Sequence, residues 1–285
     1  MAIEKIDGPH SWVADLEFEQ TGPLRRALKK AVIHPFGNYF PAPLIKAALW
    51  ALGSELAAAN WQDPGGWESM VITYARRRRR VADKVLCTLG TIPMALRNRR
   101  KLAARVIARL IDAADHEPVH VLCLGAGPGQ IIADAMLECR RQACATLVDL
   151  SAEAFDYGRR LAAECGIEDR VCFIQGDVRE MHGKVDRPAD VVKMLGICEY
   201  LTDREVTEMA RAAAVNMAPG AVIVFNSLSV EHGTERFFRR VFGLRMIHRT
   251  PRELEALMRA AGFTHFTALP EPLKVYHVII GRKAT

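Results

Sequence analysis

The chain has 285 residues, a length that allows one large domain or two smaller ones. Half of the residues are hydrophobic, a quarter are charged and the net charge is +6, values that are ordinary for a soluble globular protein. No apolar run reaches the roughly 18 residues needed to span a bilayer, and residues 1–15 lack the apolar core of a signal peptide. We therefore expect a cytoplasmic protein that has no membrane partner.

The seven cysteines form no C-x-x-C pair, so their spacing excludes the common zinc patterns. Several lie inside apolar runs, as Cys123 does between Leu122 and Leu124. Free, buried thiols in a reducing compartment fit this arrangement, and we expect no metal site.

The charge is divided unevenly along the chain. Residues 1–117 hold 18 Lys and Arg against 12 Asp and Glu, whereas residues 118–285 hold 21 of each. The whole positive excess therefore lies in the N-terminal part, which indicates two regions with different roles. We expect a helical N-terminal cap over residues 1–117 and an α/β domain over residues 118–285.

Helical patterns dominate the N-terminal part. We expect helices over Pro43–Ala59, Trp67–Leu89 and Arg97–Ala114. The Asp-Pro-Gly-Gly segment at 63–66 is typical of a turn, and the aromatic, proline-bounded segment 34–41 predicts an ordered loop.

From Val119 onward, short apolar strands alternate with helices. We expect strands over Val119–Leu124, Ala145–Asp149, Val171–Gln175, Asp190–Leu195, Ala221–Phe225 and Val275–Ile280. We expect helices over Gln130–Arg140, Ser151–Glu164 and Asp203–Asn216, and a further helix that begins with a capping box at 250–253. This alternation predicts right-handed crossovers and a mostly parallel sheet.

The first predicted strand leads into a glycine-rich loop. Gly125, Gly127 and Gly129 stand at alternate positions of Gly-Ala-Gly-Pro-Gly, where they allow a tight turn and a close approach to a ligand. A helix then directs its N-terminus at that ligand. NAD enzymes use a similar loop, so the glycines alone do not decide the cofactor.

Further candidate residues follow the next three strands. Asp149 ends the second strand, where a carboxylate can accept hydrogen bonds from ribose hydroxyls. Asp177 and Val178 follow the third strand and could bind an adenine, while Leu195 and Gly196 follow the fourth. All these positions are at the strand ends where open α/β sheets bind ligands.

Together these motifs resemble the class I S-adenosylmethionine-dependent methyltransferases, and the match extends from Val119 to Lys283. It also includes Ala-Asp-Val-Val at 189–192, Ala-Pro-Gly at 218–220 and Ala-Gly-Phe at 261–263. The resemblance implies a Rossmann-like sheet of seven strands, the last antiparallel, with helices on both faces and the helical cap in front. It also implies an enzyme whose cofactor is S-adenosylmethionine.

The resemblance assigns the cofactor-binding residues one by one. The glycine loop would pack against the methionine part, Asp149 would hold the ribose, and Asp177 with Val178 would hold the adenine. The full set of cofactor-binding residues is Gly125, Ala126, Gly127, Gly129, Asp149, Leu150, Asp177, Val178, Leu195 and Gly196. An NAD(P) site is the alternative, but the loop is G-x-G-x-G and not G-x-G-x-x-G.

The acceptor side gives weaker signals, because a sulfonium methyl group mainly needs an aligned nucleophile and the exclusion of water. We select Glu199, Tyr200, Asn226, Ser227 and Tyr74 as candidate catalytic residues. Glu199 and Tyr200 stand just past the fourth strand and could bind or deprotonate an acceptor, whereas a surface or packing role is the alternative for each. The aromatic face of Tyr74 could steady a sulfonium by cation–π attraction.

Two negative observations narrow the acceptor. The fourth strand is not followed by Asn-Pro-Pro-Tyr, and the chain has no Pro-Cys pair, so two types of nucleic-acid methyltransferase are disfavoured. Five consecutive arginines at 76–80 cannot share one helix face, and a solvated helix explains them without RNA.

Our main hypothesis is therefore a small-molecule methyltransferase of bacterial secondary metabolism. Two alternatives stay open. One is an enzyme similar to azetidine-2-carboxylate synthases, which cyclises the aminobutyrate arm of S-adenosylmethionine and releases methylthioadenosine. The other is a ribosomal RNA methyltransferase, suggested by the basic N-terminal part.

Overall fold

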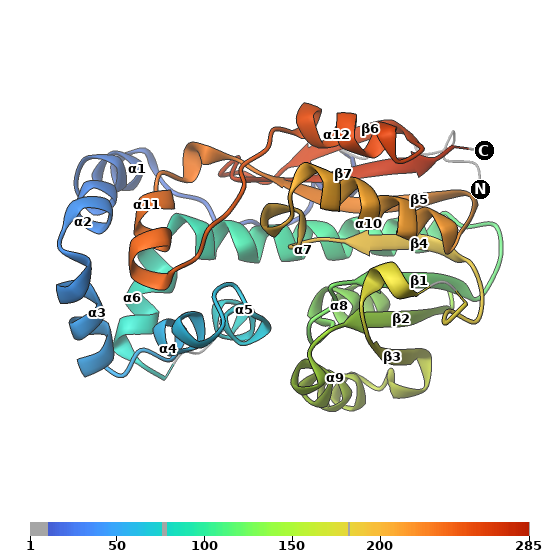
Figure 1. Ribbon diagram of the computed structural model, residues 1–285, viewed down its shortest axis with the longest axis horizontal. Helices are drawn as coiled ribbons and strands as arrows, with labels where there is room; N and C mark the ends of the chain where they lie inside the picture. Colours follow the sequence, from blue (N-terminus) through green and yellow to red (C-terminus); the bar gives the residue numbers. More distant parts are fainter. Residues whose placement is uncertain (1–10, 76–78, 182, 285) are drawn as a thin grey trace.

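The structure is a computed structural model that describes residues 11–75, 79–181 and 183–284. A seven-stranded sheet forms one end of the molecule, and the helices of the N-terminal part form the other end (Figure 1). The strands are β1 Val119–Leu124, β2 Ala143–Asp149, β3 Val171–Gln175, β4 Ala189–Met194, β5 Met217–Leu228, β6 Phe263–Pro270 and β7 Tyr276–Lys283.

The strand order is β3-β2-β1-β4-β5-β7-β6, and β7 is antiparallel to both of its neighbours. The remaining pairs from β3 to β5 are parallel. The chain places β2 and β3 on one side of β1, and β4 and β5 on the other, so the strand order reverses between β1 and β4. The predicted Rossmann-like architecture is confirmed, and the switch point between β1 and β4 is where such sheets bind ligands.

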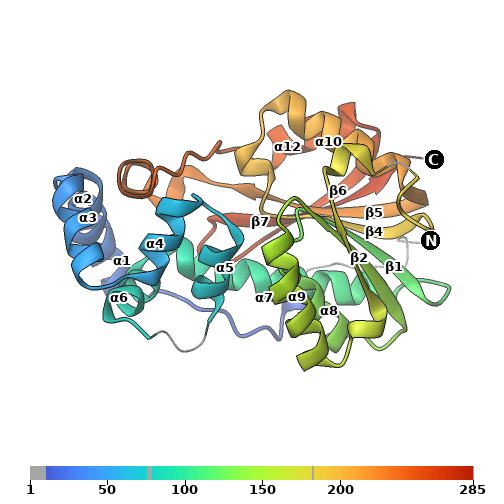
Figure 2. The same cartoon turned by 60° about the horizontal axis from the view of Figure 1, so that its bottom comes forward.

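Helices cover both faces of the sheet (Figure 2). The helices that follow β1 in sequence are α8 Gln130–Glu138, α9 Ala152–Cys165, α10 Asp203–Val215, α11 Glu235–Phe237 and α12 Pro251–Ala260. Together with the long helix α7 (Thr91–Asp112), α8 contributes to the buried core on one face, while α10 and α12 contribute to the core on the other. Strands β1 and β4 lie between these cores and are buried along their whole length, as expected for parallel strands covered on both sides.

Local signals in the sequence fix several helix starts. Ser151 accepts a hydrogen bond from the backbone N–H of Ala154 and caps α9. Thr250 and Glu253 form the predicted capping box of α12, with Pro251 in the first turn.

The N-terminal helices are more numerous than the sequence pattern predicts, and all of them except α7 are short. They are α1 Pro23–Leu28, α2 His34–Tyr39, α3 Ala42–Ala51, α4 Glu55–Gln62, α5 Trp67–Tyr74, α6 Val81–Leu89 and α7 Thr91–Asp112. The single helix predicted over Pro43–Ala59 was wrong, because Gly53 has a φ of 60° and Ser54 caps a new helix. The stretch Trp67–Leu89 is likewise divided, between α5 and α6.

The loop predicted over residues 34–41 was also wrong. Residues 34–39 form α2, which continues directly from α1 through a π-helical segment, Lys29–Ile33. Pro35 lies in the first turn of α2, where a missing N–H costs little, and the helix ends before Pro41. The aromatic residues of this segment are therefore held on a helix.

Strand β6 was not predicted from the pattern of the sequence. Its pairing with β7 shifts register between Thr264 and Thr267, and His265 has a positive φ of 52°. This irregularity breaks the alternation of apolar and polar residues that indicates a strand.

The arginine run is only partly described, since residues 76–78 lie outside the described residues. None of the helices in the described parts of the chain is long and apolar enough to cross a membrane. Helix α7 packs against α8 and β7, so the N-terminal region also contributes a layer to the sheet domain. The division of the chain at residue 117 stays a prediction.

Candidate functional site

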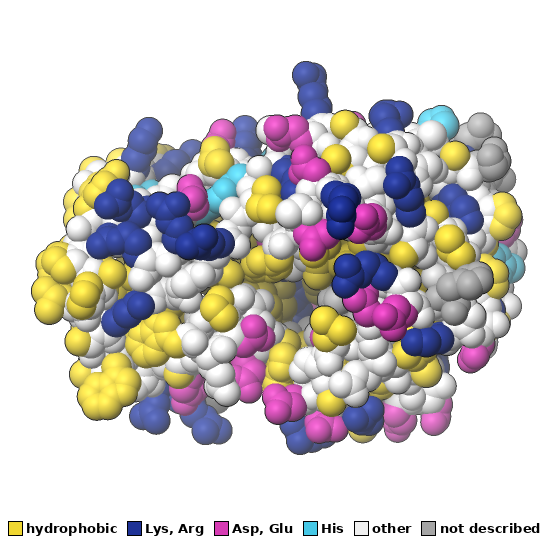
Figure 3. Space-filling model, in the orientation of Figure 1, with side chains coloured by type: hydrophobic (Ala, Val, Ile, Leu, Met, Phe, Trp, Pro, Cys, Tyr) yellow, Lys and Arg dark blue, Asp and Glu magenta, His cyan; other side chains and the backbone are white. Residues whose placement is uncertain are grey.

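A cavity of about 740 Å³ opens at the carboxyl ends of the central strands. Its volume is in the range of ligand sites in proteins, about 300–1,000 Å³. The loops after β1, β2 and β4 line one part, and side chains from α2 to α7 line the other. The face of the molecule in Figure 3 is hollowed between these two parts.

The glycine loop forms the first wall of this cavity. Gly125, Gly127 and Gly129 all have positive φ angles, between 52° and 78°, which glycine adopts without strain. A Cβ at Gly125 would lie 2.5 Å from Cγ2 of Ile197, so a side chain there would collide with the loop after β4. The loop therefore brings its backbone, and not side chains, to the cavity surface.

Asp149 stands at the end of β2 and faces the same cavity. Its Oδ2 accepts a hydrogen bond from the backbone N–H of Gly127 at 2.7 Å, and its Oδ1 accepts one from Ser151 at 3.0 Å. These two bonds fix the carboxylate while leaving a further lone pair on each oxygen. Asp149 is therefore oriented to accept hydrogen bonds from a ligand.

The structure brings most, but not all, of the predicted cofactor residues together. The predicted cofactor residues that line the cavity are Gly125, Ala126, Gly127, Gly129, Asp149, Leu150, Leu195 and Gly196. Asp177 and Val178 are outside the set of described residues that line it. The carboxylate of Asp177 is paired with the side chain of Arg179, whose hydrogen bonds lower the pKa of Asp177.

The candidate catalytic residues also fall into two groups. Tyr74, Glu199 and Tyr200 line the cavity. Asn226 and Ser227 lie outside the described lining, and both are almost completely buried in β5. Asn226 instead accepts a hydrogen bond from the backbone N–H of Gly196 at 2.7 Å, so it holds the loop after β4 in place.

Arg99 of α7 is a cavity residue that the sequence analysis did not select. Its guanidinium is 3.3 Å from Oε1 of Glu199 and lies over the ring of Tyr276, 4.6 Å from the ring centre. Both Arg99 and Glu199 are only 4% exposed. In the sequence, Arg99 stands among the basic residues Arg97, Arg100 and Lys101, so its charge gives no sign that it is buried.

Arg99 keeps its positive charge although it is buried. Burial works against the positive charge of Arg99, yet the neighbouring Tyr74, Tyr276 and Glu199 outweigh it and raise the pKa of Arg99. Burial, together with the charge of Glu199, raises the pKa of Tyr200 well above its ordinary value. Tyr200 therefore remains a neutral hydroxyl that can donate or accept a hydrogen bond.

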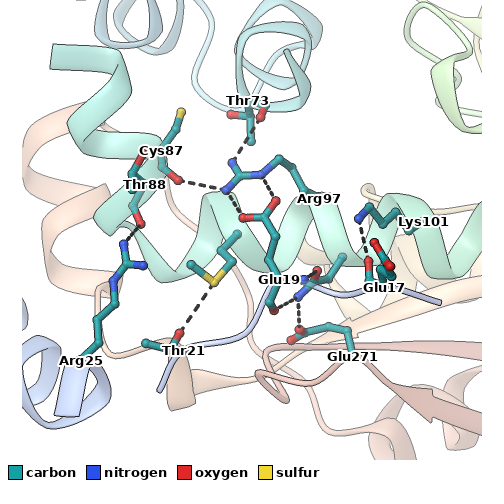
Figure 4. A network of polar contacts seen from close by, with 12 residues as sticks. Glu17, Glu19, Thr21, Arg25, Thr73, Cys87, Thr88, Arg97, Lys101 and Glu271 are labelled. Atoms are coloured by element: carbon teal, nitrogen blue, oxygen red, sulfur yellow. Dashed lines mark hydrogen bonds and ion pairs between the residues drawn. The ribbon is translucent and has the colours of Figure 1, made fainter. Parts of the chain in front are cut away.

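A second polar network joins α7 to neighbouring segments of the chain (Figure 4). Arg97 pairs with Glu19 and also donates to the carbonyl oxygens of Cys87 at 3.0 Å and Thr73 at 3.4 Å. These contacts join α5, α6 and α7 next to Tyr74. Asn98, on the same helix, donates to the carboxylate of Glu271 at 3.2 Å, in the turn between β6 and β7.

Lys193 is another cavity residue that the sequence analysis missed, because it lies inside an apolar strand. Its ammonium group donates a hydrogen bond to the carbonyl oxygen of Gly125 at 3.2 Å. The buried ammonium thus provides a positive charge beside the glycine loop.

Comparison with known proteins decides what this arrangement is. Residues 121–220 match the family model described as a methyltransferase domain. The matched segment extends from β1 into β5, so this part of the chain is a methyltransferase domain. The protein is accordingly an S-adenosylmethionine-dependent transferase, as its motifs predict.

Solved structures share the fold of this methyltransferase domain together with much of the N-terminal part. One is a possible exported protein from Bordetella parapertussis, 16% identical, with 86% of this chain and 97% of that chain covered and a TM-score of 0.65. Another is magnesium protoporphyrin IX methyltransferase from Synechocystis PCC 6803 with bound SAH, 11% identical, with coverage of 84% and 99% and a TM-score of 0.57. A third, from Streptomyces davawensis, is N,N-8-amino-8-demethyl-D-riboflavin dimethyltransferase, 18% identical, with coverage of 81% and 70% and a TM-score of 0.53. No curated protein matches the sequence.

The residues of the methyltransferase domain fit the cofactor. Asp149 keeps free lone pairs for ribose hydroxyls, the backbone of the glycine loop lines the cavity, and Lys193, whose ammonium group lies beside that loop, could neutralise the carboxylate of the methionine part. S-adenosylmethionine supplies a methyl group on a positively charged sulfur. The contact predicted between the adenine and Asp177 stays a prediction, and in the structure the partner of Asp177 is Arg179.

Proposed function

We propose that this methyltransferase domain methylates a small, largely apolar molecule of bacterial secondary metabolism. The observation that carries the proposal is that one continuous cavity joins the glycine loop to a chamber built by the N-terminal helices and by residues 237–246. This chamber is lined mainly by aliphatic and aromatic side chains. They include Ile33, Phe36, Ile45, Leu49, Leu86, Phe237, Phe238, Phe242, Leu244 and Met246.

The named activities of two structural neighbours support a small acceptor. The Streptomyces davawensis enzyme acts on a riboflavin derivative, and another neighbour, with 13% identity and a TM-score of 0.57, is a pyocyanin biosynthetic protein. An apolar chamber favours acceptors of this kind, because apolar surface gains free energy when it leaves water.

We assign the chemical roles from the charges that face the cavity. Glu199 is the candidate general base, since its carboxylate lines the cavity and Arg99 holds it from one side. Tyr74 and Tyr200 present hydroxyl groups to the acceptor. Asn226 acts indirectly, because its contacts are with Gly196, Arg99 and Glu199.

One observation favours the second candidate, cyclisation of the aminobutyrate arm. Arg99 and Glu199 present opposite charges on one cavity wall, and this pair is complementary to the carboxylate and amine of an α-amino acid. In that reaction the amine forms a bond to the γ-carbon of the arm while the carbon–sulfur bond breaks. The electron pair moves to sulfur, methylthioadenosine leaves, and the amine loses a proton that Glu199 could accept.

The ribosomal RNA alternative receives less support. It rests on the basic N-terminal part, and in the arginine run of this part residues 76–78 lie outside the described residues. The apolar chamber is unsuited to a nucleotide, whose phosphate and sugar need polar partners.

The products distinguish these reactions. The pure protein is incubated with methyl-labelled S-adenosylmethionine, first alone and then with an organic extract of bacterial small molecules or with ribosomal RNA. We expect S-adenosylhomocysteine, and label in the organic extract only, with Asp149→Ala as the inactive control. Methylthioadenosine formed without any acceptor would support cyclisation, and label in RNA would contradict the proposal.

A further inference from the structure

The first three N-terminal helices expose a row of apolar side chains to solvent. Leu24, Leu28, Val32 and Phe36 follow one another at four-residue spacing along the continuous helix formed by α1, Lys29–Ile33 and α2. Each of them is more than half exposed. Helix α3 adds Leu44 and Trp50, which are 57% and 77% exposed. We call these six residues the N-terminal apolar face.

Clusters of exposed apolar side chains are uncommon on the surface of soluble proteins. Figure 3 shows hydrophobic side chains along the end of the molecule that α2 and α3 form, with several Lys and Arg side chains beside them. Contiguous apolar patches on soluble proteins commonly mark a surface that binds a partner or a membrane.

The segment that carries this face has charges of one sign. Residues 21–54 contain five Lys and Arg but no Asp or Glu. Arg26, Lys30 and Lys46 are exposed there. Helix α11 and the segment after it pack against α2 and add Arg236 and Arg240, which contact Tyr39 and the backbone of Asn38.

This charge pattern favours an anionic lipid surface over a second copy of the chain as the partner of the N-terminal apolar face. In a symmetric dimer the same patch would meet itself, and two basic surfaces would repel each other. An anionic lipid surface has the complementary charge, and it accepts exposed Trp, Phe and Leu side chains among its acyl chains. Helices with basic residues beside such side chains are typical of proteins that lie on a membrane surface.

The position of the cavity agrees with a lipid partner. Val32 and Phe36 belong to the N-terminal apolar face and also line the cavity. The apolar surface therefore continues into the apolar chamber. Our expectation of no membrane partner rested on the lack of a spanning segment, and a protein bound at the surface needs none.

We propose that the N-terminal apolar face binds the surface of an anionic lipid bilayer. The binding energy comes from burial of the exposed apolar side chains and from attraction between the basic side chains and anionic headgroups. This binding does not depend on which reaction the cavity supports, so it can be tested without activity.

The test measures sedimentation of the full-length protein with lipid vesicles. One set contains phosphatidylcholine alone, and the other contains phosphatidylcholine with phosphatidylglycerol as one lipid in three. We expect binding to the anionic vesicles only, and weaker binding at high salt. Equal binding to both sets, or binding to neither, would overturn the proposal.

Two variants locate the surface. Lys30→Glu with Lys46→Glu should weaken binding about tenfold or more, because both changes replace attraction to the anionic headgroups by repulsion. Leu24→Ser with Leu44→Ser and Trp50→Ser should have a comparable effect. None of these five side chains is among the described residues that line the large cavity, so binding of S-adenosylhomocysteine should be unchanged.

Matched controls change similar residues elsewhere. Leu137→Ser with Val215→Ser removes two exposed apolar side chains on α8 and α10, and Arg252→Glu with Lys184→Glu reverses two exposed charges. These variants should bind vesicles as well as the unaltered protein does. If they lose binding equally, or if sedimentation velocity shows a dimer that the Leu24, Leu44 and Trp50 changes dissociate, the apolar face does not bind lipid.

Discussion

Arg99 and Glu199 are a hundred positions apart in the sequence, yet Arg99 Nη1 lies 3.3 Å from Glu199 Oε1 inside the molecule. Both side chains also face the cavity. The contact joins helix α7 to the loop after β4, and so connects the N-terminal part to the strand ends that line the cavity. A ligand that enters between them meets both charges at once.

This buried pair should be strongly coupled. Arg99→Met leaves the carboxylate of Glu199 without its cation, and we expect a loss of about 3 kcal/mol in the free energy of unfolding. Glu199→Gln should have a similar cost. The double variant should lose clearly less than the sum of the two, because it leaves no uncompensated charge. Urea denaturation of the four proteins measures the coupling.

An exposed pair provides the comparison. Arg204 and Glu208 are 3.2 Å apart on α10, and the Arg204 side chain is largely exposed. Their coupling in the same experiment should be below about 0.5 kcal/mol. If the Arg99 and Glu199 losses simply add, the two charges do not stabilise each other in the folded protein.

Asp149 should control cofactor affinity. Asp149→Asn replaces one oxygen by an amide group, which cannot accept the hydrogen bond from Gly127 or Ser151 and offers fewer lone pairs to a ribose. A hydrogen bond to a charged group contributes about 1.5–3 kcal/mol, so affinity for S-adenosylhomocysteine should fall at least tenfold. Titration calorimetry measures this. Asp156→Asn, an exposed change on α9, should leave the affinity as it is, and equal affinity in both variants would remove Asp149 from the site.

His232 should make the protein less stable in mild acid. Burial, with a contribution from the nearby His248, lowers the pKa of His232 from 6.5 to about 3. The folded protein therefore binds this proton only near pH 3, whereas the unfolded chain binds it below about pH 6.5. Protonation of His232 therefore favours the unfolded chain, and the free energy of unfolding is highest above pH 6.5 and decreases as the pH falls towards 3.

Between pH 7.5 and pH 5.5 this one group should remove about 1 kcal/mol of stability. In His232→Gln the same change of pH should lower the free energy of unfolding by correspondingly less, as measured by urea unfolding at both pH values. His265→Gln, at an exposed position, serves as the control and should keep the dependence of the unaltered protein. An identical pH dependence in the His232 variant would contradict the assignment.

The sequence predicts the cofactor half of the site better than the acceptor half, and the reason is physical. The glycine loop, Asp149 and Gly196 directly follow strands, so local pattern and the parallel topology place them at one edge. Arg99 reaches the cavity only because α7 packs along the sheet, and Lys193 only because β4 ends beside Gly125. Such long-range packing leaves no mark in the spacing of residues.

The N-terminal helices show the same limit at the local level. Helical propensity alone could not predict the break at Gly53, where a positive φ and the Ser54 cap start a new helix. Nor could the aromatic, proline-bounded segment at 34–41 be assigned to a helix until its packing against α11 was known. Tertiary contacts therefore determine where these helices begin and end.

Helix α5 should respond to the cofactor as part of a lid. A Cβ at Gly127 would lie 3.6 Å from Cβ of Trp67, so the start of α5 is directly above the glycine loop. Trp67 also contacts the ring of Tyr157 on α9, with ring centres 5.9 Å apart, and Tyr74 lines the cavity at the other end of α5. A cofactor bound against the glycine loop would therefore lie next to α5.

A ligand that binds only the folded, closed form stabilises the segments that it contacts. We expect S-adenosylhomocysteine to slow amide hydrogen exchange in Trp67–Tyr74 as well as in the glycine loop, while α10, on the opposite face of the sheet, keeps its exchange rate. The Asp149→Asn variant at the same ligand concentration should show weaker protection in both segments. If the ligand protects only residues after Val119, α5 is not part of a lid, and the loops after β4 and β5 must close the site instead. This outcome would also weaken the proposed acceptor chamber, because the same N-terminal helices form part of its walls.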